Sequence, residues 1–477
     1  MTATPQSREA RPDAAVSIAV ACVATVMLML DISVVNTALQ DISKGLDTGL
    51  SGLQWVIDAY TLPLAAVVLT AGSIADTFGR KRLFVQGMVV FTGASALCAA
   101  APGIETLVAA RAVQGLGAAV LFATALALIS EATPTPASRA KALGIFGAAI
   151  GASFAIGPFV GGSLTQWISW RAIFWINVPI GILTLVMARR VHESRDPNAR
   201  RVDVPGQIAL IGGLFLLVFA LLRGNEDGWG STRVVASLIG AGVFLVGFVV
   251  VEARSREPML PLSLFKQPTF TGPQILVFGI ASTFFAGFLY ATLYLQGVVG
   301  LSPIRTGLAY LPGTFLVFLV SGATAALMTK VKPAVLATAG LVLIAAGMLV
   351  MTMTTHVDSS WVAIEPGLLI ASIGCGLVNP AGSALALEAL PPSQSGLASG
   401  ASDTFRQTGV AVGIAWLGTF VPASGPFGTD PASYVNGVHH AFVAATVLAL
   451  VCAIGTGVLL IGRESEAVPA KLGLEPA

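Results

Sequence analysis

Long apolar segments follow one another along almost the whole chain, separated by short polar connections. A helix that crosses a lipid bilayer needs about 20 predominantly apolar residues. This length predicts about fourteen membrane-spanning helices, at residues 15–40, 52–73, 83–101, 103–129, 141–165, 171–188, 205–223, 234–252, 271–297, 306–328, 333–354, 361–386, 396–421 and 439–462. Because most connections are short, we expect consecutive helices to run antiparallel. The pattern therefore predicts an all-α integral membrane protein, whose longest segments outside the membrane lie near 189–204, 253–270 and 422–438.

The first apolar run follows a polar segment, residues 1–14, and contains Asp31. A cleavable signal peptide has a shorter apolar core, followed by a small-residue cleavage site. Since this run continues without such a site, we expect an uncleaved first helix.

The distribution of Lys and Arg predicts the orientation of the chain. Cytoplasmic segments of membrane proteins carry an excess of these residues. With a cytoplasmic N-terminus, nineteen of the 26 Lys and Arg residues fall on the cytoplasmic side, and Arg111 and Arg406 fall within helices. The outer connections hold the other five, Lys44, Arg171, Arg223, Arg233 and Arg305. We therefore expect a multi-pass protein of the plasma (inner) membrane with both termini in the cytoplasm.

Composition narrows the class of protein further. The chain is 55% hydrophobic and only 10% charged, whereas a soluble domain carries about 25% charged residues. A formal net charge of +2 provides no basic surface for a nucleic acid. The four cysteines lie far apart in apolar runs and the four histidines lack the spacing of metal ligands. We expect no metal, no cofactor and no nucleic-acid partner.

A few charges lie inside the predicted helices. An ionisable side chain near the bilayer centre costs about 2.5–3.5 kcal/mol on insertion scales, so it marks a candidate functional site. Asp31, Asp58 and Arg111 lie at similar depth in the first, second and fourth helices, which predicts one polar cluster facing an interior cavity. Asp31 is the first candidate for a proton-carrying group and Asp58 the second, with Arg111 biasing their protonation. The alternative is a static Asp–Arg pair that holds helices together.

The connection after the second helix contains a glycine- and charge-rich motif, GSIADTFGRKR, from Gly72 to Arg82. Gly72 is expected to allow close helix approach, and Gly79 to turn the chain. Asp76 is expected to accept hydrogen bonds or face a helix N-terminus, while Arg80 starts a basic run that holds the loop in the cytoplasm. This pattern, in a short cytoplasmic loop, closely resembles the signature of the major facilitator superfamily.

Further segments resemble the fourteen-helix drug:proton antiporters of that superfamily. They include LDISVVNTAL at 30–39, the arginine motif from Arg111 through Gln114 to Gly117, WRAIFWINVP at 170–179, and the segment 396–409. The fifth helix resembles the antiporter motif, with Gly157, Pro158, Gly161 and Gly162, although Ser153 stands where glycine is usual. The small residues at four-residue spacing permit close helix packing, and Pro158 is expected to kink the helix.

The resemblance implies two six-helix bundles, at 15–190 and 270–462, with a pseudo-two-fold relation. Two inserted linker helices would lie between them at 203–255, and cytoplasmic tails at 1–14 and 463–477. Substrate would bind between the bundles, and access would alternate by rocking.

The ninth helix carries a stripe of small and hydrogen-bonding residues that includes Tyr290 and Tyr294. We expect these two rings to line the substrate cavity and stack on a planar or cationic ligand. The alternative is interhelical packing. Asn36 and Gln114, on the first and fourth helices, are further candidates for substrate binding.

The resemblance and the buried charges together predict a proton-coupled exporter of lipophilic organic compounds, including drugs, antibiotics and cations. The alternative substrate is one endogenous solute, such as a siderophore, a lipid precursor or a self-made antibiotic. An intramembrane lipid-modifying enzyme is a more remote alternative, since no catalytic motif lies in a loop of useful size. No phosphate-binding loop of the GxxxxGK[ST] type is present, so ATP-driven export is not expected. We expect a monomer and no enzymatic activity.

Overall fold

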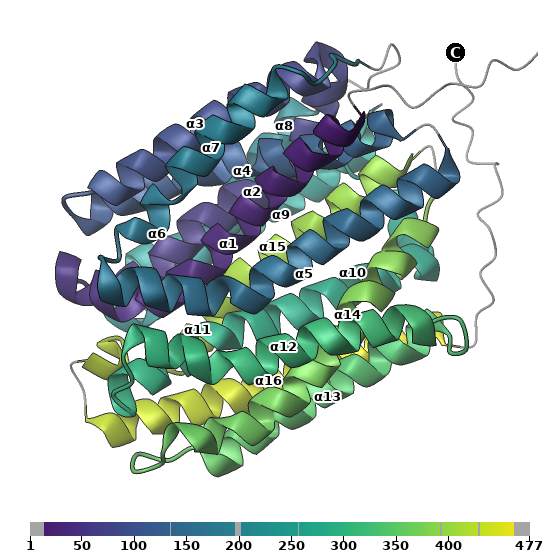
Figure 1. Ribbon diagram of the computed structural model, residues 1–477. Coiled ribbons are helices and arrows are strands. Elements are labelled where there is room, and N and C mark those ends of the chain that lie inside the picture. The colour runs from purple at the N-terminus through teal and green to yellow at the C-terminus, as the bar shows by residue number, and fades with distance from the viewer. Residues whose placement is uncertain are drawn as a thin grey trace, which may run out of the picture.

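The computed structural model describes residues 14–133, 135–195, 202–255, 257–391, 394–427 and 430–461. Long helices dominate these residues (Figure 1). The first half contains α1 (Ala14–Leu46), α2 (Leu50–Phe78), α3 (Arg80–Ala100), α4 (Ile104–Ala132), α5 (Pro136–Trp167), α6 (Ala172–Trp175) and α7 (Asn177–Ala188). Next come α8 (Val204–Asp227) and α9 (Thr232–Arg254), then α10 (Pro268–Ile280), α11 (Ala286–Leu293), α12 (Pro303–Leu327), α13 (Pro333–Thr354), α14 (Glu365–Glu388), α15 (Ser395–Gly418) and α16 (Pro431–Leu460).

Within the described ranges, twelve helical segments are long and apolar enough to cross a membrane. One of them, Pro268–Val298, consists of α10 and α11, which a π-helical turn at Ala281–Phe285 joins, and of a second π-helical turn at Tyr294–Val298 that follows α11. The shorter apolar segment Ala172–Ala188 and the more polar α15 bring the total to fourteen. The prediction of an all-helical, multi-pass membrane protein is confirmed.

Several predicted boundaries are wrong by a few residues or more. The helices extend beyond their apolar centres, so that the last one begins at Pro431 rather than at residue 439. The predicted loop from Gly72 to Arg82 is wrong, because Gly79 alone separates α2 from α3. Gly79 has φ +115°, a left-handed conformation that glycine adopts without strain, and it therefore turns the chain within a single residue.

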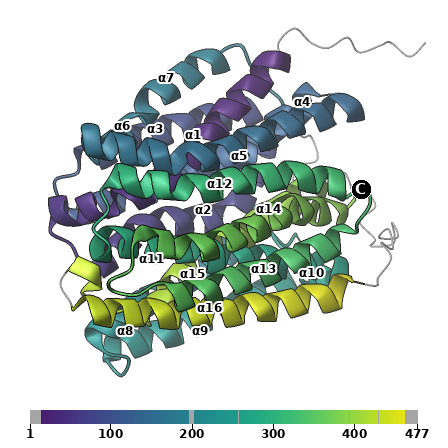
Figure 2. The same ribbon diagram turned by 60° about the horizontal axis from the view of Figure 1, so that its bottom comes forward.

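The helices associate in an order that brings distant parts of the sequence together. α2 packs on α4 and α15, while α5 packs on α1 and α12. Figures 1 and 2 both place α7 and α16 on opposite sides of the molecule, with α5 and α12 between them. The α8–α9 hairpin packs against α2 and α15, so it covers one of the contacts that join the first and last parts of the chain.

The glycines of α5 lie where its neighbours approach most closely. A Cβ atom added at Gly161 would stand 2.7 Å from the Cα of Val34, and one at Gly162 would stand 2.9 Å from the Cα of Ile304. A Cβ atom added at Gly157 would stand even closer, 2.5 Å from the Cβ of Ser33. The close packing predicted for this stripe is confirmed, against α1 on one side and α12 on the other. α5 continues through Pro158, whose carbonyl oxygen lies against Gly307 of α12.

Candidate functional site

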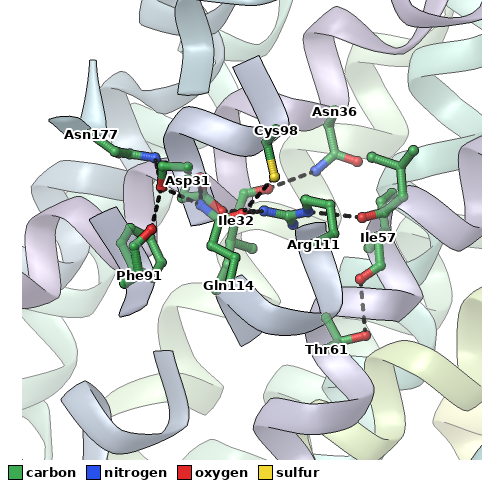
Figure 3. Close-up of polar contacts among 12 residues, drawn as sticks. Asp31, Ile32, Asn36, Ile57, Thr61, Phe91, Cys98, Arg111, Gln114 and Asn177 are labelled. Carbon is green, nitrogen blue, oxygen red and sulfur yellow. Dashed lines mark hydrogen bonds and ion pairs between the residues drawn. The ribbon is translucent and has the colours of Figure 1, made fainter. Parts of the chain in front are cut away.

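Asp31, near the middle of α1, and Arg111, in the first third of α4, form a buried ion pair (Figure 3). Nη1 of Arg111 lies 2.5 Å from Oδ2 of Asp31, and each residue is only 1% exposed. Nε of Arg111 donates to the backbone oxygen of Val56 on α2 at 3.0 Å. The guanidinium also lies over the ring of Tyr60, 4.1 Å from its centroid. One arginine therefore connects three helices.

Amide side chains satisfy the other oxygen of Asp31. Gln114 and Asn177 donate to Oδ1 at 2.9 and 2.8 Å. Gln114 also donates to Ser95 at 2.8 Å and accepts from Arg111 at 2.7 Å. Charged groups are stable in a protein interior when they are paired and their remaining hydrogen-bonding capacity is used. The Asp31 carboxylate meets both conditions.

This network includes residues that sequence reasoning missed. Asn177 of α7, Ser95 of α3 and Tyr60 of α2 were not predicted to contribute. Asn177 carried a usable signal, because it is an uncharged polar residue within an apolar helix and belongs to the segment WRAIFWINVP. Gln114, predicted to bind substrate, is fully buried and engaged within the network.

Asp58 lies outside this network, so the prediction of a single three-charge cluster is wrong. Asp58 is 0% exposed, and neither carboxyl oxygen has a hydrogen-bond partner among the described residues. Arg111, which we expected to act on both acids, reaches only Asp31. The two buried acids of the first half therefore have opposite environments, one saturated and one unpartnered.

Tyr290 of α11 lies near Asp58 and connects the two parts of the chain. Nε2 of Gln54, on α2, donates to the Tyr290 hydroxyl at 2.8 Å. The hydroxyl in turn donates to the backbone oxygen of Ile414 on α15. Asp58 follows Gln54 by four residues on α2, so it lies about one helical turn from the residue that bonds Tyr290. The ring is completely buried, so in this conformation Tyr290 holds α2, α11 and α15 together.

The other residues predicted to bind substrate also make internal contacts. Tyr294 is buried and donates to the backbone oxygen of His356 at 2.9 Å. Asn36 is half-buried and donates to Ile32 within its own helix. Close by, Gln296 donates to the backbone oxygen of Thr37 at 2.8 Å, which is another contact between α1 and the ninth membrane segment.

The motif around Gly79 forms a compact polar junction. Nε of Arg80 lies 2.9 Å from Oδ1 of Asp76, and its Nη1 lies 3.6 Å from Glu131 at the end of α4. Glu193, which the sequence did not single out, accepts from the backbone N–H groups of Lys81 and Arg82 at 3.1 Å each. A carboxylate is favourable there because the N-terminus of a helix carries free N–H groups and a partial positive charge.

Gly72 does not have the predicted role. In the described part of the structure, an added Cβ at Gly72 would meet no atom within 4 Å. The expected close helix approach at this position is therefore wrong. The tight contacts of α2 lie elsewhere, as at Tyr60, whose backbone oxygen stands against Gly115 of α4.

The arrangement of helices and the ordered motifs can be compared with known proteins. A family profile described as Major Facilitator Superfamily matches residues 21–414. The chain belongs to the major facilitator superfamily. Within this superfamily it is 36% identical to the multidrug resistance protein Stp of Mycobacterium tuberculosis over 401 residues, 83% of this chain and 74% of Stp. It is 35% identical to the puromycin resistance protein pur8 of Streptomyces alboniger over 458 residues, 93% of this chain and 90% of pur8.

A third relative of this facilitator is the cephamycin export protein CmcT of Amycolatopsis lactamdurans, with 35% identity over 94% of this chain and 92% of CmcT. Two solved structures share the fold. A POT family transporter in complex with a thioalcohol-conjugated peptide has a TM-score of 0.69 at 13% identity, over 93% of this chain and 96% of its own. The human organic anion transporter MFSD10 has a TM-score of 0.61 at 14% identity, over 94% and 100%. The prediction of the family from the sequence motifs is confirmed.

Proposed function

We propose that this facilitator exports lipophilic organic compounds, antibiotics among them, in exchange for protons that enter the cell. The names of its relatives, which are resistance and export proteins, support the substrate class. The observation that supports the proton coupling is the environment of Asp58. This carboxyl is completely buried near the Gln54–Tyr290 contact and has no hydrogen-bond partner among the described residues. The protein acts as a monomer in the inner membrane, with both termini in the cytoplasm.

The moving parts are a bundle at 15–190, a bundle at 270–462 and two linker helices at 203–255. The tails expected at 1–14 and 463–477 lie outside the described residues, apart from residue 14. In this topology Leu50 begins α2 at the outer face, and Gln54, Tyr290 and Gln296 lie in the outer half. Their contacts join the bundles there. The conformation is therefore assigned as closed toward the outside. Opening outward breaks the Gln54–Tyr290 contact between the bundles and exposes Asp58, Tyr290, Tyr294 and Asn36 to the substrate path.

Asp58 carries the proton in this scheme. An ionised carboxylate without a cation or donor is costly in a protein interior, whereas a neutral acid costs far less. We therefore assign the protonated acid to this closed conformation. When the bundles part, water reaches Asp58 and the acid exchanges its proton. Each proton that enters gains about 2.3 kcal/mol per 100 mV of inside-negative potential.

The Asp31–Arg111 pair has a supporting role. Because Asp31 already accepts from Arg111, Gln114 and Asn177, protonating it would leave a buried guanidinium without its counter-charge. That cost makes Asp31 a poorer proton carrier than Asp58. The pair instead fixes α4 against α1 and α2, and so keeps Asp58 in its apolar surroundings. The Asp76–Arg80–Glu131 junction latches the cytoplasmic side of the first bundle.

Transport in inverted membrane vesicles tests the proposal. Ethidium should accumulate inside energised vesicles that contain the protein, and a protonophore should abolish the accumulation. Adding ethidium to vesicles with a preformed pH gradient should also release protons faster than in vesicles without the protein. Accumulation that persists with the protonophore would contradict proton coupling. A drug-susceptibility panel in an efflux-deficient host, run with wild type and an Asp58→Asn variant, then separates broad export from transport of one solute.

A further inference from the structure

The α8–α9 hairpin is joined to the second bundle by hydrogen bonds at the outer end of α8. The side-chain amide of Asn225 donates to three backbone oxygens at the end of α15, those of Gly418, Thr419 and Val421, at 3.2, 2.9 and 3.3 Å. Carbonyl groups at a helix C-terminus carry a partial negative charge and accept readily from such a donor. Nε1 of Trp229 donates to Oδ1 of Asn225 at 3.3 Å, which fixes the orientation of the amide.

The other end of α8 is joined to the first bundle. Nε2 of Gln207 donates to the backbone oxygen of Ala66 on α2 at 2.7 Å, and the amide oxygen of Gln207 accepts from the hydroxyl of Thr70 on the same helix. Asn225 follows Gln207 by eighteen residues, so the two attachments lie about 27 Å apart along α8. One helix is therefore bonded to different bundles at its two ends.

The segment that follows α9 gives the hairpin a second attachment to the second bundle. Glu252, near the end of α9, accepts from the backbone N–H of Leu260 at 3.0 Å. Leu260 in turn belongs to one apolar cluster with Phe270 of α10 and Ala398 of α15. The hairpin is thus held to the second bundle at its outer turn and again after α9, and to the first bundle through Gln207.

Apolar rings connect the outer half of α8 to α2. The ring of Trp55 lies beside those of Phe215 and Phe219, with centroids 5.8 and 6.3 Å apart. Contacts of this kind can be replaced by lipid chains at little cost, because the chains are as apolar as the rings. The amide hydrogen bonds of Asn225 and Gln207 are directional and have no such replacement in hydrocarbon. When the outer halves of the bundles part, the ring contacts should therefore separate first.

An apolar hollow gives α8 room to tilt. Its volume is about 150 Å³, and it lies between Leu210 and Leu214 of α8 on one side and Phe278 of α10 and Thr404 of α15 on the other. Closely packed side chains resist displacement, whereas a hollow can be filled by movement of its wall. As the outer halves part, the cytoplasmic halves converge, and this part of α8 can approach α10 and α15.

We propose that the outer end of the hairpin moves with the second bundle and that α8 tilts about the contact between Gln207 and α2, so that outward opening separates Trp55 from Phe219. The proposal rests on the proposed function for the opening of the bundles. Since α8 cannot leave α15 at its outer end or slide along α2 at Gln207, the hairpin restricts the bundles to one direction of tilt. This restriction is the role that we assign to the two inserted helices.

Reversible crosslinking tests which contacts persist during transport. Pairs of cysteines are introduced into the full chain without its four native cysteines, joined in membranes by a bifunctional methanethiosulfonate, and assayed for ethidium accumulation in inverted vesicles. Trp55→Cys with Phe219→Cys ties the outer end of the hairpin to α2. This crosslink should abolish accumulation, and dithiothreitol should restore it. Each pair must export like the cysteine-free protein before it is crosslinked.

Two matched pairs lie at the contacts that are expected to persist. Asn225→Cys with Thr419→Cys replaces the outer attachment by a covalent one, and Gln207→Cys with Thr70→Cys does the same at the other end of α8. Both crosslinked proteins should accumulate ethidium as their uncrosslinked forms do. Loss of accumulation on crosslinking either pair would overturn the proposal, as would full accumulation with Trp55→Cys and Phe219→Cys joined.

Release of the outer attachment provides a second test. With Trp55→Cys and Phe219→Cys joined, Asn225→Ala should restore part of the accumulation, because the outer end of α8 can then leave α15. Gln207→Ala is the matched control. It removes the amide at the opposite end of the same helix and should leave the crosslinked protein inactive. Equal accumulation in the two crosslinked variants would overturn the proposal.

Distances between spin labels report the movement without any transport assay. Glu226, at the outer end of α8, Lys44, at the end of α1, and Asp358, after α13, are all exposed and suit labelling through introduced cysteines. Double electron–electron resonance in nanodiscs should give two distances for the pair at 44 and 226 and a single distance for the pair at 226 and 358. The reverse result, or a single distance for the pair at 44 and 226, would overturn the proposal.

The two proposals fail differently. If the wild type shows no proton-coupled transport in vesicles but the spin labels give the expected distances, the proposed function is wrong and the assignment of the hairpin stands. If coupled transport is present and the crosslink between Trp55→Cys and Phe219→Cys leaves it intact, the assignment of the hairpin alone is wrong.

Discussion

Nη1 of Arg111 lies 2.5 Å from Oδ2 of Asp31, although the two residues are 80 positions apart in the sequence. The pair is enclosed by hydrogen bonds from Gln114 and Asn177 and by the ring of Tyr60. Breaking a buried pair by removing one partner is far more costly than removing both. We therefore expect substitutions of Asp31 or Arg111 to lower the stability of the fold rather than to act directly on proton transfer.

Asp31→Asn should destabilise the protein by about 3–5 kcal/mol, because Arg111 then keeps a buried charge without a counter-charge. The thermal transition of the purified protein, followed by loss of helical signal or by aggregation, measures the effect. Asp31→Asn combined with Arg111→Gln should regain most of the lost stability. If Asp31→Asn leaves the transition unchanged but abolishes the proton dependence of export, Asp31 is the proton carrier and the structural role is wrong.

The Tyr290 hydroxyl should control the balance between outward-closed and outward-open conformations. Tyr290→Phe removes the contact that joins α11 to Gln54 and Ile414, so it should favour the outward-open form. Labelling of a cysteine introduced at Asn36, in a background without the four native cysteines, by a membrane-impermeant maleimide should become faster. Tyr294→Phe is the control, because its hydrogen bond to His356 lies within the second bundle. Equal labelling rates in the two variants would exclude this role for Tyr290.

The two glycine motifs should respond to substitution in opposite ways. A Cβ at Gly161 would meet the backbone of Val34, so Gly161→Ala should force α1 and α5 apart and lower the melting temperature. Gly72→Ala meets open space and should be neutral or stabilise by up to about 1 kcal/mol, because alanine is the better helix former. A larger loss of stability from Gly72→Ala than from Gly161→Ala would contradict the packing described for these helices.

Glu193 should stabilise the backbone at the junction between α2 and α3. Its carboxylate accepts two N–H groups at the start of α3, and a charge at that position stabilises a helix by about 0.3–1 kcal/mol. Glu193→Gln keeps one acceptor and should have a small effect, whereas Glu193→Ala should increase hydrogen exchange at Lys81 and Arg82. Unchanged exchange in Glu193→Ala would show that the Asp76–Arg80 pair alone fixes this junction.

Much of the fold could be predicted from the sequence, because a helix that crosses a membrane requires an apolar segment of about 20 residues, which is easily recognised. The ends of the helices could not, since polar residues continue a helix into the interfacial region, as from 431 to 438 in α16. The length of apolar runs also could not predict the single-residue turn at Gly79. Asp76 and Arg80 are charged, as loop residues often are, but they belong to two helices and pair across the junction between them.

The candidate site was predicted in part. Depth along a helix follows from residue counting, so Asp31, Asp58 and Arg111 could be placed at one level. Rotation of each helix about its axis depends on packing, and packing directs Asp58 away from Arg111. Ser95, an uncharged member of the network, carried too little signal to be chosen among the many polar residues in membrane helices, whereas Asn177 stood out in its apolar segment and was not chosen.

Substrate-driven proton release by the reconstituted protein measures the proposed exchange of protons at Asp58. Proteoliposomes containing wild type and Asp58→Asn are compared with a pH-sensitive dye as ethidium is added, after thermal melts confirm that both proteins are folded. We predict that Asp58→Asn binds ethidium and keeps its melting temperature but releases no protons. Substrate-driven proton release at the wild-type rate in Asp58→Asn would show that Asp58 does not carry the proton.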